Sequence, residues 1–188
     1  MIGPEIGPFR KQGPESQKTI REPLRKIADA KSFKELFEIL REKGGVTGSD
    51  GTFYSADELI KRIGKLRKGE EIDFAILTRS EGLREKVMEL LEKERKIKTD
   101  LEEIREILQR VEGYYGQGRG DAVTPSLEVA ELLTSILNTL KQYPENERGT
   151  LIRSWKIDEV IKDINRVFHG RRIAGKLNEI ITQLSQIK

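Results

Sequence analysis

The sequence predicts an all-α protein in which helical bundle modules are joined by one long, heptad-patterned helix of the coiled-coil type. Apolar residues recur at spacings of three and four along most of the chain, which is the pattern of helices with one buried face. Hydrophobic and charged residues each make up 36% of the chain, as expected when such helices keep the opposite face in water. A chain of 188 residues is also long enough to bury a core.

The composition excludes several classes of site. The chain contains no cysteine, which removes disulfides, thiolate metal sites and a cysteine nucleophile. Its single histidine, His169, excludes a two-histidine metal site and stands at a predicted helix end, where a cation is favoured. We therefore expect no catalytic residues, no cofactor and no bound metal.

The same composition indicates a cytoplasmic protein outside the membrane. No stretch approaches the roughly 18 apolar residues that a membrane span requires, and the first residues lack the apolar segment of a signal peptide. The Lys- and Glu-rich, Met-poor composition is typical of thermophile proteins, but coiled coils have the same bias.

The N-terminal part of the chain divides into a tail and a small helical module. Residues 1–15 contain three Gly-Pro pairs, and this composition predicts a disordered tail. The module is predicted over residues 16–80. Its first element is a short helix that starts at Pro23 and runs to about Ala30, because proline in a first turn loses no helical hydrogen bond.

Two capping boxes predict the main helices of this module. Ser32–Glu35 and Ser55–Glu58 each place a serine three residues before a glutamate and are followed by apolar residues at helical spacing. The helices are expected to end at Gly44-Gly45 and Gly69.

The connections within the module carry weaker signals. The segment around Asp50-Gly51 matches an EF-hand calcium loop at only three positions, so we interpret it as a Gly-rich connection between helices. Residues 72–77 form an apolar run that suits either a buried helical turn or a strand.

The strongest signal is a heptad pattern that predicts a single long helix over residues 81–112. Thr99–Glu102 resembles an internal capping box, but the unbroken heptad phase favours one helix. Glu94 is the one polar residue in the pattern, so we expect Glu94→Leu to raise thermal stability. We call these positions the heptad seam: Leu83, Val87, Leu90, Glu94, Ile97, Leu101, Ile104, Leu108 and Val111.

A Gly-rich segment, residues 113–123, is predicted to act as a hinge after the long helix, because several closely spaced glycines disfavour helix. Aromatic and Arg side chains in and beyond it suit base stacking and phosphate contact. The possible nucleic-acid contacts are Tyr114, Tyr115, Arg119, Arg171 and Arg172.

Residues 124–188 are predicted to form a C-terminal helical unit. Thr124-Pro125 supplies an N-cap and a first-turn proline for an apolar helix. A polar turn after Tyr143-Pro144 leads to an amphipathic helix that ends at His169-Gly170, and a last helix runs nearly to Lys188.

The functional prediction is a non-catalytic interaction or scaffold protein. An exposed apolar seam needs cover, so we expect a homodimer formed through the seam, together with an unknown protein partner. The intramolecular alternative is that the C-terminal helices fold back along the seam. A nucleic-acid-associated accessory protein is the second functional hypothesis, because the net charge of +3 is concentrated at the two ends of the chain.

Overall fold

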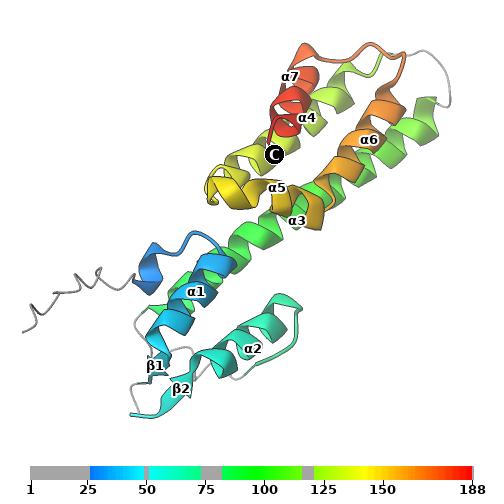
Figure 1. Cartoon of the computed structure of the whole chain (residues 1–188). Coiled ribbons are helices and arrows are strands. Elements are labelled where there is room, and N and C mark those ends of the chain that lie inside the picture. Colours follow the sequence, from blue (N-terminus) through cyan, green and yellow to red (C-terminus); the bar gives the residue numbers. More distant parts are fainter. Residues whose placement is uncertain (1–25, 49–50, 73–81, 116–120, 188) are drawn as a thin grey trace, which may run out of the picture.

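The fold is organised around one long helix, α3, along which the other elements are arranged (Figure 1). The computed structural model describes residues 26–48, 51–72, 82–115 and 121–187. The all-α class is confirmed, with one small two-stranded sheet in addition. In chain order the elements are η1 (Ile27–Asp29), α1 (Phe33–Lys43), β1 (Gly45–Thr47), β2 (Phe53–Ser55), α2 (Ala56–Arg67), α3 (Leu83–Tyr115), α4 (Val123–Leu140), α5 (Glu145–Ser154), α6 (Ile157–Phe168) and α7 (Gly175–Ser185).

The heptad seam is covered within a single chain. Each of its nine residues is at most 6% exposed, including Glu94. Leu91, Asp100 and Ile107 are also buried, so the covered stripe is wider than the two positions per heptad of a two-stranded coiled coil. α4, α6 and the N-terminal module cover the seam within the chain, as the intramolecular alternative expects, and the homodimer stays a prediction.

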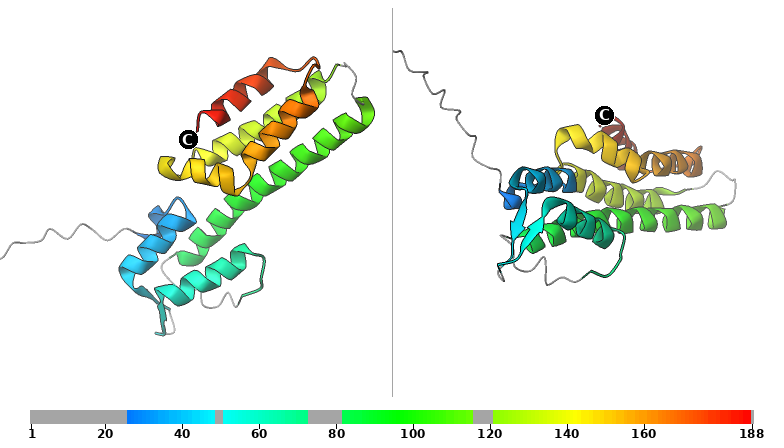
Figure 2. Two further views of the ribbon diagram at one scale, coloured as in Figure 1. Left: turned by 45° about the vertical axis from the view of Figure 1, so that its right-hand side comes forward. Right: turned by 60° about the horizontal axis from the view of Figure 1, so that its bottom comes forward.

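Two hydrophobic clusters share α3, one on each half of the helix. Figure 2 shows the helices of the two modules lying along the two halves of α3. Leu83 to Leu91 pack with η1, α1 and α2 in the N-terminal module. Ile97 to Val111 pack with α4, α6 and α7 in the C-terminal module. Glu94 lies on the helix between the two clusters, so the polar interruption in the heptad pattern marks the junction of the modules.

The predicted long helix is continuous, and it is longer than expected at its C-terminal end. α3 passes through Thr99–Glu102 without a break, which confirms one helix over the internal capping box. It runs to Tyr115, so residues 113–115 of the predicted hinge are helical. Residues 116–120 lie outside the described residues.

Both predicted serine N-caps form at the helix starts. The Ser32 hydroxyl accepts a hydrogen bond from the Glu35 amide at 3.1 Å, and the Glu35 carboxylate accepts one from the Lys31 amide at 2.8 Å. The Ser55 hydroxyl likewise accepts from the Glu58 amide at 3.3 Å. The short helix expected at residues 23–30 is described only from residue 26, where η1 forms one 3-10 turn.

The connection between α1 and α2 is a β-hairpin and not a simple helix connection. β1 and β2 pair antiparallel, with Gly45 opposite Ser55 and Thr47 opposite Phe53. Gly45 has φ +146°, and an added Cβ would overlap the Tyr54 carbonyl oxygen of the facing strand. Close approach of the two backbones thus requires glycine at this position.

The C-terminal unit differs from expectation in three places. α4 begins before the predicted Thr124 cap, at Val123, whose amide donates to the Asp121 carboxylate at 3.0 Å. The predicted polar turn after Pro144 is the helix α5. The last helix, α7, is shorter than predicted and ends at Ser185.

Two expectations fall on residues that the structure does not describe. The predicted disordered tail over residues 1–15 lies outside the described residues, as does the part of the 72–77 segment from residue 73 onward. Ile72 itself is partly buried against the N-terminal cluster. Among the helices of the described residues, none is long and apolar enough to cross a membrane.

Candidate functional site

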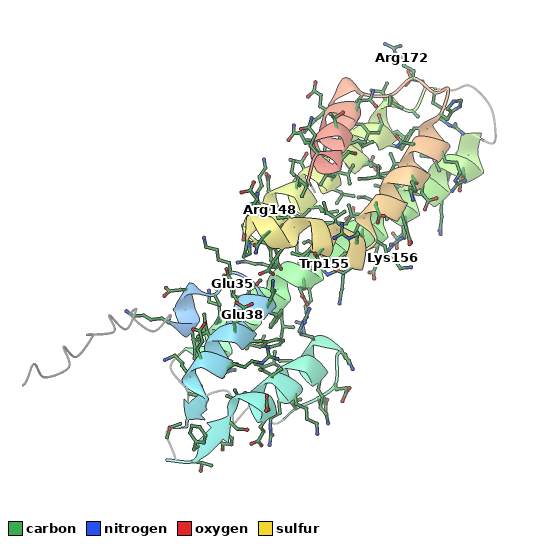
Figure 3. All side chains as sticks on the ribbon, in the orientation of Figure 1. Glu35, Glu38, Arg148, Trp155, Lys156 and Arg172 are labelled. Atoms are coloured by element: carbon green, nitrogen blue, oxygen red, sulfur yellow. The ribbon has the colours of Figure 1, made fainter. Side chains whose placement is uncertain are left out.

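The predicted nucleic-acid contacts that are described lie at one end of the C-terminal module. Tyr114 is 85% exposed in the last turn of α3, and Tyr115 follows it in the helix. Arg172 is exposed at the same end, where its carbonyl accepts from the Ala122 amide at 3.0 Å (Figure 3). Arg171 is half-buried, and its guanidinium donates to the Val167 carbonyl at 2.9 Å.

This end of the module is not a concentrated basic patch among the described residues. Arg172 lies 3.9 Å from the Asp121 carboxylate, and Arg110 lies 3.6 Å from Glu128. Arg166 pairs with Glu112 and Asp163. Arg119, the remaining predicted contact, lies outside the described residues.

A second candidate site, which the sequence did not predict, lies between the two modules. It is a cavity of about 400 Å³ between α1 and α5, and Glu94 of α3 also lines it. We call it the junction cavity. Figure 3 shows Glu35 and Glu38 at the end of α1 that faces α5. The residues that line the cavity are Ser32, Phe33, Lys34, Phe37, Glu38, Arg41, Arg67, Glu94, Tyr143, Asn146, Glu147, Thr150 and Leu151.

Glu94 and Arg67 form a two-point ion pair on one side of the cavity. Arg67 Nη2 donates to Glu94 Oε1 at 2.6 Å, and Arg67 Nε donates to Glu94 Oε2 at 3.2 Å. The guanidinium also lies over the Phe33 ring, 4.5 Å from its centroid. These contacts give the buried Glu94 carboxylate a counterion and explain its place in an otherwise apolar seam.

Tyr143 lines the cavity, and its hydroxyl is itself fully buried. The residue is 3% exposed, and its hydroxyl has no hydrogen-bond partner among the described residues. Burial, and then the negative charge of Glu94, raise the pKa of the Tyr143 hydroxyl above its usual range, so the phenol is neutral. A buried hydroxyl without a partner costs free energy, and a ligand that reached it would supply the missing bond.

The position of Tyr143 is fixed from two sides. Its ring packs edge-on against Trp155, with the centroids 5.7 Å apart. Arg148 donates to the carbonyls of Tyr143 at 3.0 Å and Lys141 at 2.9 Å, which holds the corner between α4 and α5. The phenol is therefore positioned by packing before any ligand arrives.

Glu147 is a second buried carboxylate of the cavity, and it joins the two modules. Its Oε1 atom accepts a hydrogen bond from the Ser32 hydroxyl at 3.0 Å, across 115 positions of sequence. Burial raises the pKa of Glu147, while the Ser32 hydrogen bond and the charge of Lys34 oppose the rise. Glu35 and Glu38 raise it further, so the surroundings of this carboxylate carry more acid than base.

The walls of the cavity are apolar and its rim is cationic, whereas its floor is formed by acidic and phenolic residues. Phe33, Phe37 and Leu151 supply apolar wall, with the two Phe rings 6.0 Å apart. Lys34 and Arg41 are exposed at the rim on α1. The cavity thus combines an apolar wall, a cationic rim and a floor that contains two carboxylates and a phenol.

Comparisons of this chain with protein-family models, with curated proteins and with solved structures find no match. The junction cavity therefore has to be interpreted from its own chemistry. Glu94 is the one sequence signal that could have pointed to it, because a carboxylate in an apolar seam requires a partner. Arg67, Tyr143 and Glu147 carried no comparable signal, since their contacts depend on how the modules pack.

Proposed function

We propose that this chain is a non-catalytic binding protein whose junction cavity receives a segment of a partner protein. The observation that carries the proposal is the buried Tyr143 hydroxyl, which has no hydrogen-bond partner among the described residues and belongs to a residue that lines a cavity shared by both modules. A cavity of about 400 Å³ falls in the size range of sites for small ligands and side-chain anchors.

A polypeptide segment suits the mixed chemistry of the cavity. An apolar side chain can pack on Phe33, Phe37 and Leu151, while a polar group on the same segment reaches the Tyr143 hydroxyl. The fixed position of the phenol limits the entropy that binding must overcome. A segment seated here would contact both modules at once and would stabilise their packing on α3.

The polar groups of the cavity suit a binding role better than a catalytic role. The Ser32 hydroxyl caps α1 and donates to Glu147, so both of its hydrogen-bonding roles are already structural. The carboxylate of Glu94 is engaged by Arg67 at two points. His169, the single histidine, is exposed at the C-cap of α6, away from these groups.

Self-association through the seam is not part of this proposal. The seam side chains pack within the chain, so an exposed apolar stripe no longer requires a second copy. The partner that we propose is a different protein, and it contacts the gap between the modules.

Selection of random displayed peptides on the immobilised full chain tests the proposal. Thr150 is an exposed residue of the cavity, so Thr150→Trp should fill the cavity and weaken the selected peptides about tenfold or more. Thr182→Trp, at an exposed position on α7, is the matched control and should bind them normally. Selected peptides that bind both variants as tightly as the unmodified chain would show that the cavity is not the site.

A nucleic-acid role is the second candidate, favoured by the exposed Tyr114 ring at the same end of the module as Arg172. Stacking on Tyr114 and phosphate contact by Arg172 would make binding strongly salt-dependent. Fluorescence anisotropy with single-stranded and duplex probes measures this, with Tyr114→Ala and Arg172→Ala expected to weaken binding. Absence of binding to either probe at low salt would eliminate this candidate.

A further inference from the structure

We infer that the junction cavity recognises an alkylammonium group, such as the side chain of a lysine carried by the bound segment. This inference rests on the proposed function, because it names the chemistry of the group that the cavity receives. It is drawn from the buried groups of the floor and from the apolar wall above them.

The buried floor of the cavity favours a cation. Glu94 and Glu147 are its two buried carboxylates, at 6% and 8% exposure. Arg67 pairs with Glu94, whereas Glu147 accepts a hydrogen bond from the neutral Ser32 hydroxyl. The charges that act on Glu147 are those of Lys34 and of two further acids, Glu35 and Glu38. An ammonium that reaches Glu147 would add a direct ion pair to the weaker influence of Lys34.

The Tyr143 hydroxyl completes the recognition of an amine. A protonated amine has three donors and no acceptor, so it can donate to a carboxylate and to a phenol oxygen together. The Tyr143 oxygen has no partner among the described residues, and the charges that act on it are those of Glu94, then Arg67 with the opposite sign, then Glu147. The hydroxyl can therefore accept one of these bonds.

The walls match the stem of a lysine. A lysine side chain joins four methylene groups to its charged head and buries that stem along apolar surface. Phe33, Phe37 and Leu151 provide apolar surface in the lining of the cavity. A compact ammonium ion alone would leave this wall uncovered, so the apolar stem contributes to the selection.

An anion is the competing occupant, because Lys34, Arg41 and Arg67 also line the cavity. Arg67 is already engaged at two points by Glu94, and Lys34 and Arg41 lie at the exposed rim. An anion would thus meet cations only at the solvated mouth, where their attraction is weak, and would face buried carboxylates below.

The test is a titration of the full ¹⁵N-labelled chain with n-butylammonium, n-butanol, pentanoate and inorganic phosphate at matched ionic strength. Amide shifts report the location of binding, and the single tryptophan, Trp155, reports on the Tyr143 ring that it contacts. We expect saturable shifts around the cavity with n-butylammonium and weaker or no shifts with the other three.

Two conservative variants locate the contacts. Glu147→Gln retains an acceptor for Ser32 but removes the charge, and Tyr143→Phe removes only the hydroxyl. Each is expected to weaken n-butylammonium binding about tenfold. Glu179→Gln, an exposed acid on α7, is the matched control and should leave binding unchanged.

Each outcome bears on the inference. Stronger binding of pentanoate or phosphate than of n-butylammonium overturns it, and so does n-butylammonium binding that Glu147→Gln leaves unchanged. If none of the four probes shifts the cavity resonances, the alkylammonium inference fails. The proposed function still stands in that case, provided that Thr150→Trp weakens the selected peptides. If the selected peptides ignore Thr150→Trp, the proposed function itself fails.

Discussion

At the scale of single residues, Glu94 shows how a structure can reverse a prediction made from sequence. Its position in the heptad seam suggested that leucine would be more stable there. Its carboxylate, however, receives two hydrogen bonds from Arg67, which also lies over Phe33. We expect Glu94→Leu to lower the free energy of unfolding by about 1–3 kcal/mol, because the partly buried guanidinium loses its partner.

Urea denaturation measures this change. Glu92→Leu, at an exposed position of the same helix, is the matched control and should alter stability by no more than about 0.5 kcal/mol. The double variant Arg67→Met with Glu94→Leu should recover much of the loss, since it leaves no charge without a partner. A single Glu94→Leu variant more stable than the unmodified chain would contradict the role given to the ion pair.

The raised pKa of Glu147 predicts how the stability of the fold depends on pH. Burial raises its pKa above the ordinary 4.5, so the carboxyl holds its proton to a higher pH in the folded state than in the unfolded chain. The stability that this proton provides is complete below the ordinary pKa and is lost as pH rises through the raised value. Glu147→Gln keeps a neutral acceptor for Ser32 and avoids that loss.

The stability of Glu147→Gln relative to the unmodified chain should therefore increase from acidic to neutral pH. Thermal unfolding of both chains across this range gives the difference directly, because the other titrating groups are common to both. A difference that stays constant, or that shrinks toward neutral pH, would mean that the carboxyl is not stabilised in its protonated form.

At the scale of elements, the hairpin between α1 and α2 depends on Gly45. Its φ of +146° is one that other residues rarely adopt, and a Cβ would overlap the Tyr54 carbonyl oxygen. Gly44 also has a positive φ, +73°, but a Cβ there meets nothing within 4 Å. We expect Gly44→Ala to cost about 1–2 kcal/mol from its backbone conformation alone.

Gly45→Ala should cost distinctly more than Gly44→Ala, because the two strands must separate to admit the methyl group. The comparison of their thermal midpoints, with far-UV circular dichroism to confirm that each variant folds, measures the effect. Equal midpoints for the two variants would show that the hairpin does not require close approach of its backbones.

The elements that sequence predicted are those whose apolar stripe is long or whose cap is local. α1 and α2 were found because Ser32 and Ser55 cap them within three residues, and α3 because its seam persists over many turns. α5 was missed because its buried positions include Glu147 and Gly149 beside Ile152, which gives no clear helical stripe. The hairpin was missed because each strand has only three residues.

The junction cavity could not be predicted in the same way. Ser32 meets Glu147 only when both modules are packed on α3, and Arg67 meets Glu94 only when α2 is packed on α3. Neither pair has a sequence spacing that any local pattern encodes. Glu94 could have indicated a polar partner, but its place in the seam was interpreted as a site where leucine would be more stable.

At the scale of the whole molecule, one chain covers its own heptad seam. The two hydrophobic clusters meet on α3 at Glu94, and each half of the helix has its own cover. Burial of the seam should therefore not depend on protein concentration. The absence of cysteine from the sequence allows single cysteines to report on this burial.

Thiol labelling of Val87→Cys and Val111→Cys, followed as the protein is diluted from micromolar to nanomolar concentration, is the most direct test. Both positions are at most 2% exposed, one in each cluster, whereas Thr99→Cys on the exposed face of α3 is the control that should label rapidly throughout. The account predicts that both seam thiols stay protected at every concentration and that light scattering gives the 21.5 kDa of a single chain. A mass of two chains at micromolar concentration, together with faster labelling of the seam thiols after dilution, would show that a second chain covers the seam.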